Sequence, residues 1–141
     1  MKIVFSTKYV SRPSFLDICR YAYDYGFSGF EIYDAVNERK QHHDSILRRD
    51  CVADSKRKLI NRSLSVSALS CPQAVESEEF TASLIEKYVD MAAGAGIENV
   101  IVRIEAETPF SVLKEKLGTA IKRAEASDVG ILLETIGYLS N

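Results

Sequence analysis

Short runs of apolar, mostly β-branched residues alternate along this chain with longer stretches in which apolar residues recur with helical spacing. The first pattern is typical of strands that are covered on both faces, and the second places apolar side chains on one face of a helix. Strands are therefore predicted at residues 3–6, 30–33, 64–68, 100–104 and 131–135. Four helical stretches lie between these strands.

Two of the helices are predicted from residues that favour helix ends. The first should open at Ser14 and stop at Gly26, because glycine readily adopts the left-handed conformation that closes a helix. The third should begin near Ser77 and end at Gly94 or Gly96. Their apolar stripes are Phe15, Ile18, Ala22 and Tyr25 in the first helix, and Phe80, Leu84, Tyr88, Met91 and Ala95 in the third.

The fourth helix has a well-marked start. Thr108 is predicted as its N-cap and Pro109 as its first residue, where the missing N–H of proline costs nothing. Its expected apolar stripe is Phe110, Leu113, Leu117, Ile121 and Ala124. The second helix is the least defined and falls somewhere within residues 44–62.

Regular alternation of strands and helices indicates a parallel sheet with right-handed crossovers, the α/β class. Two continuations are open at this point. A doubly wound fold with five strands would close with a fifth helix, which this sequence lacks. A TIM barrel needs about 250 residues, so this chain would form its first five strands and four helices, a partial barrel. No linker or repeat interrupts the chain, and residues 1–141 are expected to form a single domain.

Charged residues occur where a covered parallel strand would normally be aliphatic. Glu31, Arg103 and Glu134 lie within predicted strands, and Glu105 follows one directly. In a barrel these side chains would point inward at the C-terminal mouth, where the active sites of such barrels lie. Buried charges are costly unless they are paired or bind a metal, which favours a site. The alternatives are strands with one solvent-exposed face, or an Arg103 that simply neutralises the glutamates.

Composition narrows the class of protein. Eighteen basic residues and 20 acidic ones give a net charge of -2, so the chain lacks the excess positive charge that is typical of proteins that bind nucleic acid. The sequence has no apolar run near the roughly 20 residues of a membrane span, and its N-terminus lacks the apolar core of a signal peptide. The three cysteines form no ligand or disulfide motif. A cytoplasmic protein with neither nucleic acid nor membrane as partner is expected.

Three segments resemble one enzyme family. They read GFSGFEI at residues 26–32, LSVSAL at 64–69 and, most specifically, LLETIGY at 132–138. Together they resemble the sugar phosphate isomerase/epimerase family of xylose-isomerase-like TIM barrels. The resemblance follows the whole chain in order and spacing, and covers the first five strands of the barrel.

The resemblance implies a divalent metal, Mn²⁺, Mg²⁺, Co²⁺ or Zn²⁺, held by Glu, Asp, His and Glu at the ends of strands five to eight. The first ligand maps onto Glu134, which the resemblance also makes a catalytic carboxylate, and the other ligands are expected beyond Asn141. It places Glu31 and Arg103 in the cavity as contacts to sugar hydroxyls or a phosphate, and Glu105 is assigned to substrate binding with them. Residues 1–141 would supply only one of the metal ligands and are therefore expected to be inactive on their own.

The family's chemistry is the transfer of a proton on the carbon next to a carbonyl. A divalent cation stabilises the enediolate as charge develops, and carboxylates serve as base and acid. Two other functions remain open: a non-catalytic parallel α/β binding or scaffold module, and an abasic-site endonuclease-like barrel. The endonucleases carry zinc-binding histidines after strands two and three, whereas the histidines here are the adjacent His42 and His43. The exposed edges of the first and fifth strands predict self-association.

Overall fold

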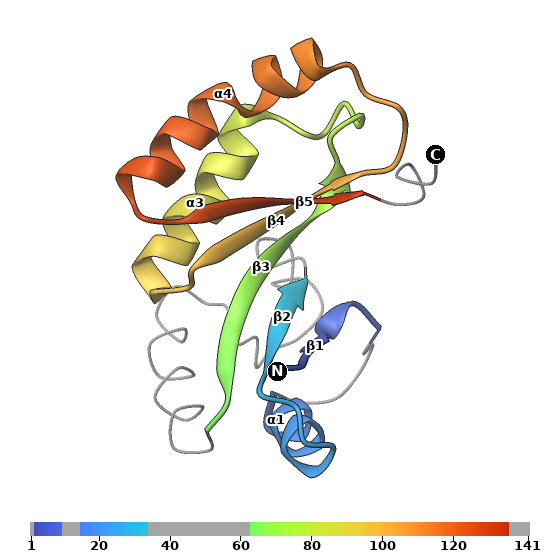
Figure 1. Ribbon diagram of the computed structural model, residues 1–141, viewed down its shortest axis with the longest axis vertical. Coiled ribbons are helices and arrows are strands. Elements are labelled where there is room, and N and C mark those ends of the chain that lie inside the picture. The colour runs from blue at the N-terminus through green and yellow to red at the C-terminus, as the bar shows by residue number, and fades with distance from the viewer. Residues whose placement is uncertain (1, 10–14, 34–62, 136–141) are drawn as a thin grey trace. The chain divides into compact units, whose positions relative to one another are not determined.

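The computed structural model of this protein describes residues 2–9, 15–33 and 63–135 (Figure 1). The chain divides into two compact units, Met1–Leu69 and Ser70–Asn141. Five parallel strands form one open sheet in the order β1-β2-β3-β4-β5. They are β1 (Val4–Ser6), β2 (Gly29–Tyr33), β3 (Ser65–Ala74), β4 (Asn99–Ile104) and β5 (Gly130–Thr135). Residues 65–69 of β3 belong to the first unit and residues 70–74 to the second.

Between the strands lie α1 (Phe15–Asp24), α3 (Ala82–Ala95) and α4 (Phe110–Ala126), and a 3₁₀ turn η1 (Thr7–Tyr9) follows β1. The predicted parallel α/β class and all five strands are confirmed. The helix predicted within residues 44–62 lies outside the described residues, as does Ser14. The expectation of a single domain stays a prediction.

In the N-terminal unit, β1 and β2 pair in parallel, with Val4 opposite Gly29. The end of α1 was predicted correctly: Gly26 has a φ of 73° and its N–H donates to the carbonyl of Tyr23. Ile18, Cys19 and Ala22 of the helix are buried. Tyr25 was expected on the same stripe, which was wrong: it follows the last helical residue and is 76% exposed.

Gly29 sits where β2 meets β3 most closely. A Cβ atom there would lie 2.1 Å from the carbonyl oxygen of Ser65, a distance that no side chain tolerates. The Ser65 N–H donates in turn to the carbonyl oxygen of Ser28 at 3.2 Å. Glycine is thus required for the pairing of the two strands, which explains one of the glycines in the segment at residues 26–32.

In the C-terminal unit, β4 and β5 pair in parallel from Asn99 opposite Gly130 to Ile104 opposite Thr135. The helices α3 and α4 lie side by side against these strands (Figure 1). The core between the layers is made of fully buried side chains from both helices and from β4: Ile85, Tyr88, Val89, Ala92, Val100, Val102, Leu117 and Ala120. Because Val100 and Val102 pack against the helices, Arg103 between Val102 and Ile104 lies on the other face of β4.

The start of α3 was predicted too early. The helix begins after Thr81, whose Oγ1 accepts the N–H of Leu84 at 3.2 Å. Ser77 belongs to the preceding turn, and Phe80 is buried ahead of the helix rather than on it. The end at Gly96 is confirmed, with a φ of 62°.

The start of α4 was also wrong. Pro109 is the N-cap and Phe110 the first helical residue, and no side chain caps the helix. The Thr108 hydroxyl donates instead to a carboxylate oxygen of Glu76 at 2.5 Å. Phe110 and Ile121, expected on the apolar stripe, are 79% and 39% exposed.

β3 is longer than predicted, and β5 is less covered than an inner strand of the sheet. β3 continues past the predicted end at Ala68 to Ala74, through Pro72. Leu133 of β5 is 47% exposed, because β5 lies at the sheet edge and α4 is the helix that packs against it. Leu132 on its other face is 48% exposed. Self-association through such edges stays a prediction.

Candidate functional site

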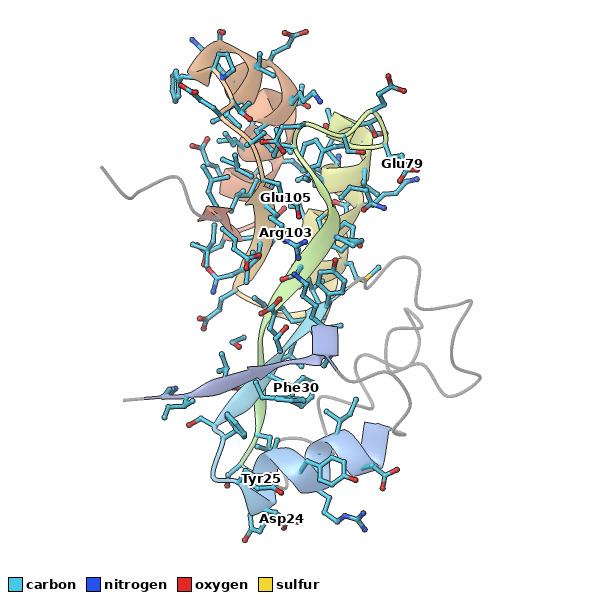
Figure 2. All side chains as sticks on the ribbon, turned by 90° about the vertical axis from the view of Figure 1, so that its right-hand side faces the viewer. Asp24, Tyr25, Phe30, Glu79, Arg103 and Glu105 are labelled. Carbon is cyan, nitrogen blue, oxygen red and sulfur yellow. The ribbon has the colours of Figure 1, made fainter. Side chains whose placement is uncertain are left out.

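Arg103 is the centre of an ion cluster in the C-terminal unit. Its Nη1 donates to Oε1 of Glu105 at 2.9 Å, and its Nε donates to Oε2 of Glu134 at 3.3 Å. The arginine side chain is only 8% exposed, whereas those of Glu105 and Glu134 are 50% and 49% exposed. Figure 2 shows Arg103 and Glu105 next to one another along β4. A buried cation is thus held between two acids that reach solvent.

Strand geometry explains why these three residues meet. Glu105 is the first residue after β4, two positions beyond Arg103, and its carboxylate reaches Nη1 of Arg103. The parallel register places Arg103 directly opposite Glu134 on β5. Val102 and Ile104, which alternate with Arg103, are buried. The predicted meeting of Arg103, Glu105 and Glu134 is therefore what the structure has.

Glu31 lies in the other unit. It is half-buried on β2, opposite Ser6 of β1, between the buried Phe30 and Ile32. That Glu31 joins the cluster around Arg103 stays a prediction.

One acidic residue of this region was not singled out in the sequence. Glu76 follows β3, and its carboxylate accepts the backbone N–H of Glu105 at 3.3 Å and that of Ala106 at 3.1 Å. Its Oε1 also accepts the hydroxyl of Thr108 at 2.5 Å. The carboxylate therefore holds the loop that joins β4 to α4. An extended β3 was the signal that would have found it, since Glu76 then falls at a strand end.

These donors decide the protonation of Glu76. Burial alone would raise its pKa, but hydrogen bonds from Thr108 and from the backbone N–H groups of Glu76, Ala106 and Glu105 outweigh it and lower the pKa below the ordinary 4.5. The carboxylate is therefore ionised at neutral pH. An ionised acceptor makes stronger hydrogen bonds to the loop than a neutral one.

Glu134 is the residue predicted to bind a divalent metal. A carboxylate suits the hard, oxygen-preferring divalent ions, and this one is half-exposed with one oxygen on Arg103. Within residues 2–9, 15–33 and 63–135, no group of three or more His, Cys, Asp or Glu side chains is placed to hold a metal ion. His42 and His43 lie outside the described residues. Glu134 thus fits as one ligand of a cation, not as a complete site.

None of the helices in the described part of the chain is long and apolar enough to cross a bilayer. No family model matches the chain, and no curated protein matches it in sequence.

Solved structures do match it in fold. A xylose isomerase domain protein from Planctomyces limnophilus has a TM-score of 0.66 and 12% identity, covering 96% of this chain and 53% of that one. An IOLI protein with a bound zinc atom has a TM-score of 0.69 and 16% identity, covering 97% and 52%. A sugar phosphate isomerase/epimerase from Parabacteroides distasonis has a TM-score of 0.65 and 16% identity, covering 95% and 51%.

These neighbours are TIM barrels, and this chain spans about half the length of each. The barrel continuation of the strand pattern is thereby confirmed over the doubly wound one. Together with the order of the strands, the matches are consistent with the N-terminal half of a xylose-isomerase-like barrel. In such barrels the ends of strands four and five, where Arg103 and Glu134 lie, open onto the active-site face.

Proposed function

We propose that this chain, with the fold of the N-terminal half of a xylose-isomerase-like barrel, contributes to an enzyme that moves a proton beside the carbonyl group of a sugar or sugar phosphate. The name of one neighbour, a sugar phosphate isomerase/epimerase, supports this reaction class. The zinc atom in another supports a divalent metal. The proposal concerns the full-length protein.

The observation that carries the proposal is the burial of Arg103 between Glu105 and Glu134. Removing an arginine from water costs several kcal/mol unless its partners are well placed, and an apolar residue of similar size often serves stability as well. The cluster is therefore poorly explained as a device for stability alone. It lies on the strand face opposite the helices, at the edge where barrel enzymes bind substrate.

Each residue has a role that follows from its contacts. Nε of Arg103 donates to Oε2 of Glu134, which favours one orientation of the carboxylate. We assign Glu134 as a metal ligand and catalytic carboxylate. A divalent cation bound there would polarise the substrate's carbonyl oxygen and stabilise the enediolate. Glu31, Arg103 and Glu105 are assigned to the substrate's hydroxyl or phosphate groups, with Glu105 accepting and Arg103 donating hydrogen bonds.

The test uses the full-length protein and its Glu134→Gln variant. Mn²⁺ binding is measured by calorimetry, and deuterium uptake from solvent at the carbon beside the carbonyl is measured by NMR over a panel of ketoses and their phosphates. Loss of a ligand should weaken metal binding by more than the roughly 10- to 100-fold typical of an outer-sphere partner. Deuterium uptake should fall with it.

A matched control is Asp90→Asn, which removes the same charge from an ion pair on α3. It should keep both metal binding and deuterium uptake. Unchanged behaviour of Glu134→Gln in both measurements rejects the assignment. Metal binding that depends on Glu134 without deuterium uptake from any sugar would favour the non-catalytic binding module.

A further inference from the structure

The loop between β4 and α4 has little packing to hold it. Glu105, Ala106, Glu107 and Pro109 are exposed, and Thr108 is only half-buried. A loop without buried side chains depends on its hydrogen bonds for a defined conformation. The acceptors for two of its backbone N–H groups and for the Thr108 hydroxyl are the two oxygens of Glu76.

Glu76 is itself held from both sides. The N–H of Val75 donates to the carbonyl oxygen of Arg103 at 2.9 Å, which extends the pairing of β3 with β4. Nζ of Lys116, on α4, donates to the carbonyl oxygens of Val75 at 2.6 Å and Ser77 at 3.3 Å. The backbone on either side of Glu76 is thus fixed to the strand and the helix that flank the loop, so its carboxylate is a rigid acceptor.

We infer that Glu76 is a positioning residue for the Arg103 cluster: by holding the backbone of Glu105, it sets the carboxylate to which Arg103 donates. The inference rests on the proposed function, and assigns a role to a residue outside the cluster itself. Three hydrogen bonds connect Glu76 to Glu134: the Glu105 N–H donates to Glu76, Nη1 of Arg103 donates to the Glu105 carboxylate, and Nε of Arg103 donates to Glu134.

The two oxygens of Glu76 allow its links to be separated. Oε2 accepts the Glu105 N–H, whereas Oε1 accepts both the Ala106 N–H and the Thr108 hydroxyl. In Glu76→Gln the remaining oxygen keeps the two bonds of Oε1, and the amide NH₂ then faces the Glu105 N–H, donor against donor. Thr108→Val removes one bond of Oε1 and leaves the Glu105 link intact.

The experiment compares both variants in the full-length protein, with Glu79→Gln as control. Glu79 is an exposed residue of the turn between β3 and α3 that also holds Glu76, Figure 2 labels it away from Arg103, and its substitution makes the same change in charge. Two readouts are taken: the solvent exchange rate of the Arg103 Nε–H by NMR, and kcat and KM for deuterium uptake.

Glu76→Gln should speed the exchange of the Arg103 Nε–H and lower kcat by about 10- to 100-fold, because a misplacement near 1 Å at a catalytic group costs about that much. KM should change less. Thr108→Val and Glu79→Gln should change both readouts by less than about twofold. Urea unfolding confirms that each variant is folded.

Equal effects of Glu76→Gln and Thr108→Val would overturn the inference, since they would show a general loosening of the loop. So would an Arg103 Nε–H exchange rate that Glu76→Gln leaves unchanged. A wild-type protein without deuterium uptake would contradict the proposed function alone, because the exchange rate at Arg103 still decides whether Glu76 positions the cluster.

Discussion

Two arginines in the C-terminal unit make ion pairs that differ in how far the arginine is buried. Arg123 on α4 meets one partner, Asp90 on α3, with Nε–Oδ1 and Nη2–Oδ2 distances of 2.5 and 2.8 Å. Both side chains are nearly half-exposed, at 49% and 43%. Arg103 is buried and donates to two acids, Glu105 just after β4 and Glu134 on β5. The first pair joins two helices, and the second joins two strands at their carboxyl ends.

The difference shows which pair needs a function to explain it. The hydrogen bond to Asp90 and the charge of Asp90 raise the pKa of Arg123. Exposed pairs of this kind add little to stability and lose it with salt. The Arg103 cluster instead places a desolvated cation where an aliphatic residue would pack, which favours a site over a structural fastening.

The largest expected contrast comes from replacing each arginine by methionine. Arg103→Met should lower turnover by about 100-fold or more, since Glu134 loses its orienting donor and the substrate a cation. The free energy of unfolding should change by no more than about 1 kcal/mol, because methionine fills the buried site and the two glutamates reach water. Arg123→Met should leave turnover unchanged. Steady-state kinetics and urea unfolding measure both.

A large loss of stability in Arg103→Met, with turnover reduced only in proportion to the folded fraction, would contradict the functional assignment. The cluster would then be a structural ion network. A fall in turnover of similar size in Arg123→Met would remove the distinction between the two arginines.

Lysine substitutions should give a smaller contrast. Arg103→Lys keeps the charge, but a single ammonium group cannot reproduce the forked donors that reach Glu105 and Glu134 together. Turnover should fall by about tenfold, less than in Arg103→Met. Arg123→Lys should again leave turnover unchanged. An Arg103→Lys variant with wild-type kinetics would show that charge alone suffices at this position.

Much of this cluster follows from sequence because strand periodicity is strict. Alternation of side chains places Arg103 and Glu105 on one face once Val102 is assigned to the other. Their meeting with Glu134 requires only that strands four and five pair in parallel and in register, which adjacent βα units do. Sequence order alone does not reveal how deeply Arg103 is buried, since its burial depends on tertiary packing around the strand face that carries it.

Glu76 and Thr108 show where such reasoning stops. The third strand was predicted to end at Ala68, but β3 continues to Ala74 through Pro72, a residue that lacks a backbone donor and is unusual inside a strand. Thr108 before Pro109 has the usual signature of a helix cap, yet its hydroxyl serves a glutamate 32 residues earlier in the chain. Hydrogen bonds between loops depend on tertiary placement, which local patterns do not encode.

The smallest expected effect is a dependence of stability on pH. It comes from Glu76, which holds the backbone of Glu105 beside Arg103. The pKa of Glu76 is lowered in the folded protein from its ordinary 4.5. The unfolded chain therefore binds a proton first as pH falls, and the stability that Glu76 adds above its unfolded pKa is lost as pH drops through the folded pKa. Urea unfolding of the full-length protein between about pH 3 and 6 should show this slope.

The variants Glu76→Gln and Thr108→Val test whether Glu76 causes this dependence on pH. Glu76→Gln removes the titrating group, so its free energy of unfolding should fall less steeply with acid than that of the wild type. Thr108→Val removes one of the donors that lower the pKa of Glu76, and should give an intermediate slope. If Glu76→Gln keeps the full wild-type slope, other carboxylates carry the acid sensitivity. The loop after β4 would then not depend on the ionisation of Glu76, and the hydrogen bonds to its neutral form would suffice to hold Glu105.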